Sequence, residues 1–144
     1  MLFLKTHDDI CESNFPFPFA GYKVAAIEKL RATSLAHTIF ITGQFLDYFG
    51  MPHVPTYLPG ISVIVDVENM KAAIPGDGNT PIVFTYTVDV AKFVAASLEL
   101  PTWPQRSVIV GDRITANQLV SLVEKVRSKL YQYYMITHIK RSLC

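Results

Sequence analysis

The sequence is poor in charge and in cysteine. Only 17% of its 144 residues are charged, and the formal net charge is +1. Such a balance lacks the basic surface by which nucleic-acid binders attract phosphate, so we expect no nucleic-acid partner. The two cysteines, Cys11 and Cys144, lie near opposite ends without zinc-binding or redox spacing. We therefore expect two free thiols and a reducing compartment.

The sequence also has no apolar run suited to a membrane or to export. The longest uncharged stretch, 48–65, is interrupted by three prolines and two glycines, so it cannot form a continuous spanning helix. The apolar start at 1–4 is followed at once by Lys5 and is too short for a secretory signal. We expect no membrane partner and a cytoplasmic protein, with the nucleus as a further location.

Common phosphate-binding and hydrolase motifs are missing. The sequence contains no G-x-G-x-x-G, no G-x-x-x-x-G-K-[ST] and no G-x-S-x-G. The nearest match, Gly-Asp-Gly at 76–78, lies between two predicted strands and is interpreted as a hairpin turn. A polar cluster at 7–12 contains His, Asp, Cys and Glu, but its spacing matches no known zinc site, so we expect no metal.

Apolar residues are abundant, and their periodicity predicts alternating helices and strands. Half of the residues are hydrophobic and 12% are aromatic, which predicts one core-rich domain. A short apolar segment at 44–49 is expected to form a helical turn or two, and the proline-rich stretch 51–59 a loop. The remaining pattern predicts helices over 20–32, 87–98 and 115–130, and strands over 37–42, 62–67, 71–74, 81–86, 107–111 and 131–136.

Two threonines indicate where helices begin. Thr87 is expected to cap the helix that runs to about 98, and Thr115 with Gln118 forms a capping box. Apolar residues at 119, 122, 123, 126 and 130 then recur at helical spacing and predict a buried face. The alternation as a whole predicts an α/β fold with one inserted hairpin and a small α+β portion toward the C-terminus.

Lys23 stands at the start of the first predicted helix, where a positive charge opposes the helix dipole. Pattern alone is compatible with an ordinary surface lysine. Short-chain dehydrogenases place a tyrosine four residues before their lysine, and Phe19 occupies that position here. The tyrosine–lysine dyad is therefore absent.

Five segments, in this order, carry a family resemblance: 19–30, 42–50, 73–78, 84–91 and 107–112. They resemble the NmrA-like proteins of fungi, which are atypical short-chain dehydrogenases related to the isoflavone reductases. The likeness runs from about 15 to 130. It implies a Rossmann-like fold that binds NADP or NAD and, in the reductase branch, transfers a hydride.

The resemblance also implies roles for individual residues. Lys23 matches a lysine that acts as a catalytic acid–base group or as a ribose anchor. The segment after the predicted strand lines the nicotinamide end of the cofactor cleft in the family, which implies cofactor contacts for Thr42, Gly43 and Phe45. By the same resemblance, Gln44 and Phe49 are expected to face a small-molecule substrate of unknown identity.

The family is about twice as long as this sequence, and its first half holds the glycine-rich βαβ unit that binds the pyrophosphate. We therefore expect a partial Rossmann-like fold without that unit, truncated and weak or inactive as it stands. Its domain is expected over 15–137, as the C-terminal half of an NmrA-like domain, with a poorly defined segment at 1–14 and a basic tail at 138–144. The alternative is a transcription-regulatory interaction module without catalysis, which docks a protein partner through the loop 51–59.

Overall fold

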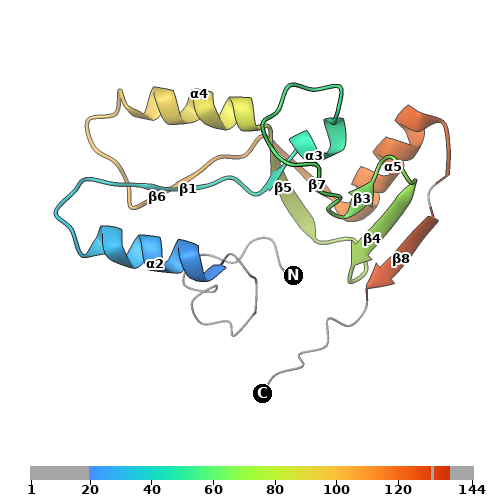
Figure 1. Cartoon of the computed structure of the whole chain (residues 1–144), viewed down its shortest axis with the longest axis horizontal. Helices are drawn as coiled ribbons and strands as arrows, with labels where there is room; N and C mark the ends of the chain where they lie inside the picture. The colour runs from blue at the N-terminus through green and yellow to red at the C-terminus, as the bar shows by residue number, and fades with distance from the viewer. Residues whose placement is uncertain (1–19, 131, 137–144) are drawn as a thin grey trace, which may run out of the picture.

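The computed structural model describes residues 20–130 and 132–136. The predicted terminal segments 1–14 and 138–144, both cysteines and the polar cluster at 7–12 lie outside these residues. Helices and strands alternate, which confirms a mixed α/β fold (Figure 1). The elements are α2 (Ala20–Arg31), β1 (Ile39–Ile41), β2 (Gln44–Phe45), α3 (Asp47–Gly50), β3 (Val65–Asp66), β4 (Lys71–Pro75), β5 (Pro81–Thr85), α4 (Thr87–Ser97), β6 (Arg106–Val108), β7 (Asp112–Thr115), α5 (Ala116–Arg127) and β8 (Gln132–Ile136).

The strands form three small sheets with both parallel and antiparallel pairs. In the first, β1 and β6 run parallel, with Ile39 opposite Arg106. In the second, β5 lies between β2, which is parallel to it, and β7, which is antiparallel. In the third, β4 lies between antiparallel β3 and parallel β8. Parallel pairs of this kind need crossover connections, and helices supply several of them.

The turn after β4 does not form the predicted hairpin. It joins β4 to β5, but these strands belong to different sheets and do not pair. Gly76 and Gly78 both have positive φ, at 62° and 73°, so the glycines do reverse the chain. The turn then docks on α5, because the Asn117 amide N–H donates to the Gly78 carbonyl at 3.2 Å. The turn lies where it was predicted, but the two strands that it joins pair with other strands.

The buried core lies between α5 and the second and third sheets. The capping box of α5 is present as predicted: Thr115 Oγ1 accepts from the Gln118 amide at 3.1 Å, and Gln118 Oε1 accepts from the Thr115 amide at 2.8 Å. The buried face of α5 is narrower than predicted, because Leu122 and Val126 are exposed by 53% and 74%. The core consists of Val65, Ala72, Ile74, Ile82, Phe84, Ala116, Leu119 and Val120.

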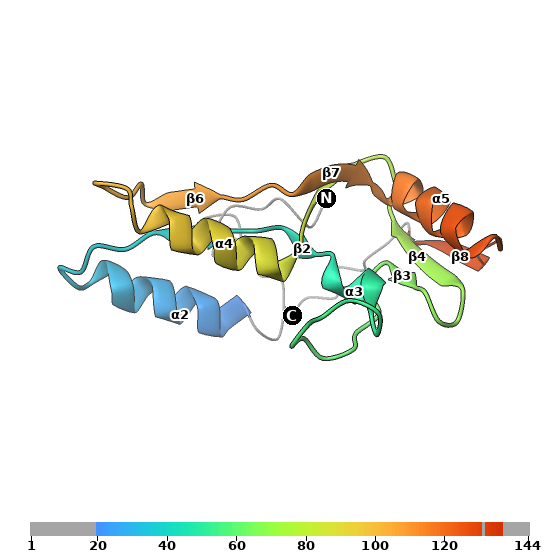
Figure 2. The same ribbon diagram turned by 90° about the horizontal axis from the view of Figure 1, so that it is seen from above.

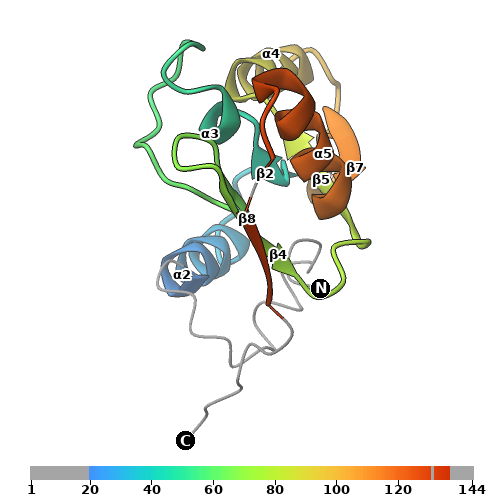
Figure 3. The same ribbon diagram turned by 90° about the vertical axis from the view of Figure 1, so that its right-hand side faces the viewer.

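The other part of the molecule is built around the β1–β6 pair. Figure 1 shows α4 above this pair and α2 below it, and the end view in Figure 3 likewise separates the two helices to opposite sides. Seen from above, both helices extend along the pair and away from the core (Figure 2). Within residues 20–130 and 132–136, no strand pairs with the second edge of β1, and α4 contains no buried residue. In the same ranges no helix is long and apolar enough to cross a membrane.

Candidate functional site

The segment predicted to bind a cofactor directly follows β1. Figure 1 shows that α2 runs antiparallel to β1, so the start of α2, which carries Lys23, lies at the same end as Thr42. Lys23 is exposed, and no hydrogen bond ties its amine to another residue of the described ranges. Ligands of open α/β sheets bind beyond the carboxyl ends of the strands. The topology thus brings these two predicted residues to the expected end.

Thr42 is held by the Thr85 side chain, and Gly43 packs against the backbone of Val83. The buried Thr85 hydroxyl donates to the Thr42 carbonyl at 2.8 Å and accepts from the Gly111 amide at 3.3 Å. Gly43 has φ of +69°, and a Cβ placed there would clash with the Val83 carbonyl oxygen. A glycine is therefore required at this position by backbone packing alone. The cofactor contacts of Thr42 and Gly43 stay predictions.

The residues predicted to contact substrate are packed against the core side of the molecule. β2 pairs Gln44 with Phe84 and Phe45 with Thr85, and the side chains of Gln44 and Phe45 are half-buried. The ring of Phe49 meets that of Phe84 edge to face, with centroids 5.8 Å apart. This contact gives Phe49 a packing role. Substrate contacts by Gln44 and Phe49 stay predictions.

A buried carboxylate, Asp47, fastens this segment to α4. Asp47 is 0% exposed, and its Oδ1 accepts hydrogen bonds from Thr87 Oγ1 at 2.5 Å and from Thr56 Oγ1 at 2.8 Å. Its Oδ2 accepts from the Thr87 backbone amide at 3.0 Å. The residue at the N-cap position is Tyr86, and it makes no side-chain cap. The prediction that Thr87 caps this helix is therefore wrong: Asp47, 40 residues away, accepts the orphan amide instead.

The environment of Asp47 favours its charged form. Burial acts to raise the pKa of Asp47, but the hydrogen bonds from Thr87 and Thr56 together outweigh it and hold the pKa below its ordinary value. An ionised carboxylate can remain buried here because both of its oxygens accept hydrogen bonds. The described ranges contain no buried side-chain nitrogen or oxygen without a hydrogen-bond partner.

The proline-rich loop 51–59 is tied down at two adjacent residues. Thr56 donates to Asp47, and the Tyr86 hydroxyl donates to the Pro55 carbonyl at 2.8 Å. Tyr57, the next residue, is fully exposed. The loop is therefore fixed against the site on its inner side. A protein partner at this loop stays a prediction.

Asp47, Thr85 and Tyr86 were missed as functional residues by sequence reasoning. All three lie inside segments that carry the family resemblance, 42–50 and 84–91. A usable signal existed for one of them, because Asp47 is the only Asp, Glu, Lys or Arg between Arg31 and Asp66. A single carboxylate in a long apolar segment requires dedicated donors when it folds.

Comparison with known proteins identifies relatives of the chain. It is 40% identical over 109 residues to Oxidoreductase BOA1 of Botryotinia fuckeliana, covering 76% of this chain and 36% of that protein. It is 30% identical over 105 residues to Pinoresinol reductase 2 of Arabidopsis thaliana, covering 69% and 31%. The homologues are oxidoreductases. The chain spans about a third of the length of these relatives, and no protein-family model matches it.

Solved structures show the fold to which these elements correspond. AtPrR2 with NADP+ and (+)pinoresinol matches with a TM-score of 0.61 and 24% identity, over 85% of this chain and 39% of that one. UDP-glucuronic acid 4-epimerase from Bacillus cereus, in complex with UDP-glucuronic acid and NAD, matches with a TM-score of 0.54 and 16% identity, over 84% and 38%. The chain therefore has part of a Rossmann-like fold, as predicted.

Proposed function

We propose that the chain is the carboxyl-terminal part of an NmrA-like, NAD(P)-dependent reductase and supplies the nicotinamide side of its cofactor site. The observation that carries this proposal is that the start of α2, which carries Lys23, lies at the same end of the β1–β6 pair as the segment that follows β1 (Figure 1). Oxidoreductase relatives and structural neighbours that hold NADP+ or NAD support it. For the substrate, the same reasoning supports a small molecule that accepts a hydride and nothing narrower.

The residues of this chain fit one end of a dinucleotide. An exposed lysine and the half-buried side chains of Thr42 and Phe45 suit a ribose and a nicotinamide ring. A pyrophosphate is held by a glycine-rich turn at a helix N-terminus, and the 144 residues contain no such motif. In this proposal the pyrophosphate anchor comes from polypeptide outside these residues. The cofactor, when bound, supplies the hydride.

The chain's own side chains then have distinct tasks. Lys23 donates hydrogen bonds from Nζ to the ribose hydroxyls or moves a proton at the reacting oxygen of the substrate. Gln44 and Phe49 limit where the substrate lies. Asp47 and Thr85 touch neither ligand, and they hold the segment from Thr42 onward in one conformation through the hydrogen bonds described above. They are positioning residues.

Calorimetric titration with NADPH tests the proposal. The isolated chain should bind weakly or not at all and should show no turnover, because the main anchor for the pyrophosphate is not among its residues. Addition of the part of Oxidoreductase BOA1 that this chain does not match should create measurable binding. Lys23→Ala should then weaken it, whereas Lys29→Ala, an exposed lysine in the last turn of the same helix, should not.

Two results would contradict the proposal. Micromolar affinity of the isolated chain for NADPH would show that these residues already contain a complete cofactor site. Equal affinity of the Lys23→Ala and Lys29→Ala variants in the complemented protein would remove Lys23 from the site. In the second case the assignment of the fold would stand, and the role of α2 would be wrong.

A further inference from the structure

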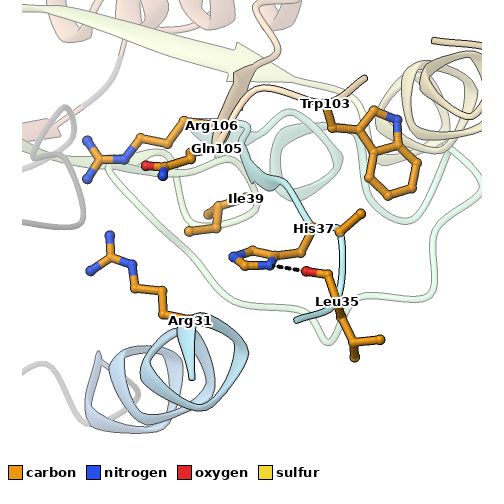
Figure 4. A pocket seen from close by; sticks show the side chains of 8 residues that line it. Arg31, Leu35, His37, Ile39, Trp103, Gln105 and Arg106 are labelled. Atoms are coloured by element: carbon orange, nitrogen blue, oxygen red, sulfur yellow. Dashed lines mark hydrogen bonds between the residues drawn. The ribbon is translucent and has the colours of Figure 1, made fainter. Parts of the chain in front are cut away.

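A cavity of about 510 Å³ lies at the opposite end of the β1–β6 pair from the segment after β1 (Figure 4). Its position follows from the topology, because parallel pairing of Ile39 with Arg106 makes both strands begin side by side. The connections that enter these strands from α2 and α4 therefore converge. Arg31, Leu35, His37, Ile39, Trp103 and Arg106 line the space between them.

The walls of this cavity are held by hydrogen bonds between the two connections. The Ile39 amide donates to the Gln105 carbonyl at 3.1 Å, and the hydroxyls of Thr38 and Ser107 share a hydrogen bond of 2.8 Å. The Trp103 indole N–H donates to a carbonyl in the last turn of α4 at 2.7 Å. The aromatic wall is thus anchored to the helix that precedes it.

Two arginines stand on one side of the cavity. The guanidinium groups of Arg31 and Arg106 point to the same side, away from the indole ring (Figure 4), and none of the described residues that line the cavity is acidic. Each arginine also takes part in a further interaction. A guanidinium has five N–H donors in a planar fork, so it can serve a second acceptor, and this fork matches a carboxylate.

A histidine adds a polar group between the charged and the aromatic sides. His37 Nδ1 lies 2.9 Å from the Leu35 carbonyl, and it carries the proton because a carbonyl can only accept. The hydrogen bond fixes the ring and leaves Nε2 for a ligand (Figure 4). Of the remaining lining residues, Gln105 is polar, and Leu35, Ala36, Ile39 and Trp103 are apolar.

We propose that this cavity binds a small organic carboxylate with a flat apolar body. The carboxylate lies at Arg31 and Arg106, and the body packs against Trp103 and Ile39. The cavity volume falls within the range of about 300–1,000 Å³ that is typical of small-molecule sites. The site is separate from the proposed cofactor cleft, because it lies at the amino ends of β1 and β6. It does not depend on Lys23.

The single tryptophan of the chain makes the site directly observable. Because Trp103 lines the cavity, its fluorescence should change saturably when 3-phenylpropionate is added to the intact chain. The uncharged analogue 3-phenylpropanol tests the need for charge, and inorganic phosphate tests the need for the apolar body. Both should bind about tenfold more weakly or worse, since each lacks one of the two interactions.

Arginine variants decide whether the response comes from this cavity. Arg106→Gln and Arg31→Gln should each weaken 3-phenylpropionate binding by about tenfold or more. Arg127→Gln, in the last turn of α5, is the matched control and should bind as the wild type does. If Arg106→Gln fails to fold, Arg31→Gln, at the exposed end of α2, carries the test alone. An unchanged fluorescence signal, equal binding of the alcohol, or equal losses in the control would overturn the proposal.

Discussion

Replacing Asp47 by alanine should lower the free energy of unfolding by about 3–6 kcal/mol. The magnitude follows from three hydrogen bonds to a carboxylate that is 0% exposed. Loss of the acceptor for the Thr87 amide removes the cap of α4, which costs about 1–2 kcal/mol. The hydroxyls of Thr56 and Thr87 lose their acceptor in a partly buried site, at about 1–2 kcal/mol each.

Asp47→Asn separates charge from shape. Its amide oxygen can still accept from the Thr87 amide, and its N–H groups can donate to the two hydroxyls, so the loss should be only about 1–2 kcal/mol. In the folded protein the pKa of Asp47 lies below its ordinary value of 3.8. Its contribution is therefore complete above that value and is lost as the pH falls through the folded-state pKa. The advantage of wild type over Asp47→Asn should shrink in the same window.

Urea unfolding followed by circular dichroism, at neutral pH and again below pH 3.8, measures both effects. Asp89→Ala is the control, because Asp89 lies in the first turn of the same helix but is solvated. Its ion pair with Lys92, at 2.8 Å, joins two exposed side chains, so its removal should cost much less. If Asp47→Ala were no less stable than Asp89→Ala, the buried carboxylate would not be the cap of α4.

Further substitutions test the backbone contacts of the site. Gly43→Ala should destabilise the protein by about 3 kcal/mol or more, because its Cβ would meet the Val83 carbonyl and its φ is positive. Gly76→Ala has the same sign of φ but open space around it, so about 1 kcal/mol is expected, and equal losses in the two melts would refute the steric argument. Thr85→Val keeps the shape and removes the hydroxyl, which should cost about 1–3 kcal/mol and speed hydrogen exchange at the Gly111 amide. Unchanged exchange there would show that the Thr85 hydroxyl does not hold that amide.

Helices were predictable from the sequence because their signals are local. The expected range 20–32 corresponds to α2, and the capping box at Thr115 begins α5 as predicted. The end of α5 is also local, since Ser128 adopts the left-handed conformation with φ of 53°. The buried faces were harder to predict, because helical spacing does not reveal how wide a surface the neighbouring strands cover. Leu122 has the right spacing and is still exposed.

Strand partners could not be read from the sequence, because pairing depends on residues far apart in the chain. A glycine-containing turn between two apolar runs favours a hairpin, yet β4 pairs with β3 and β8 while β5 pairs with β2 and β7. The strand β7 at Asp112–Thr115 was not predicted, because it merges with the start of α5 and is half exposed. Only the resemblance to a known family indicated that the pieces form part of a Rossmann-like fold.

Only the part of the candidate site that is formed by one continuous segment could be predicted from the sequence. The segment 42–50 was expected to follow a strand and to lie near a ligand, and the structure places it at the carboxyl end of β1. Two hydrogen bonds fix this segment. The Thr87 amide donates to Asp47 across 40 residues of sequence, and the Thr85 hydroxyl donates to the Thr42 carbonyl across 43 residues. The periodicity of apolar residues in the sequence does not indicate hydrogen bonds between residues so far apart. A lone carboxylate in an uncharged stretch is the one signal that could have pointed to them.

The two sides of the proposed cofactor site differ in how firmly the fold holds them. The segment after β1 is bound to the core side through Asp47 and Thr85, so its conformation is set by buried hydrogen bonds. Among residues 21–31 of α2, the most buried are Val24 and Ile27, and both are only half-buried. Because none of these residues is fully buried, we expect α2 to open more easily than the core. The position of Lys23 therefore depends on the polypeptide that packs on α2 and on the second edge of β1 in the complemented protein. We thus expect Lys23 to affect cofactor affinity only in the complemented protein.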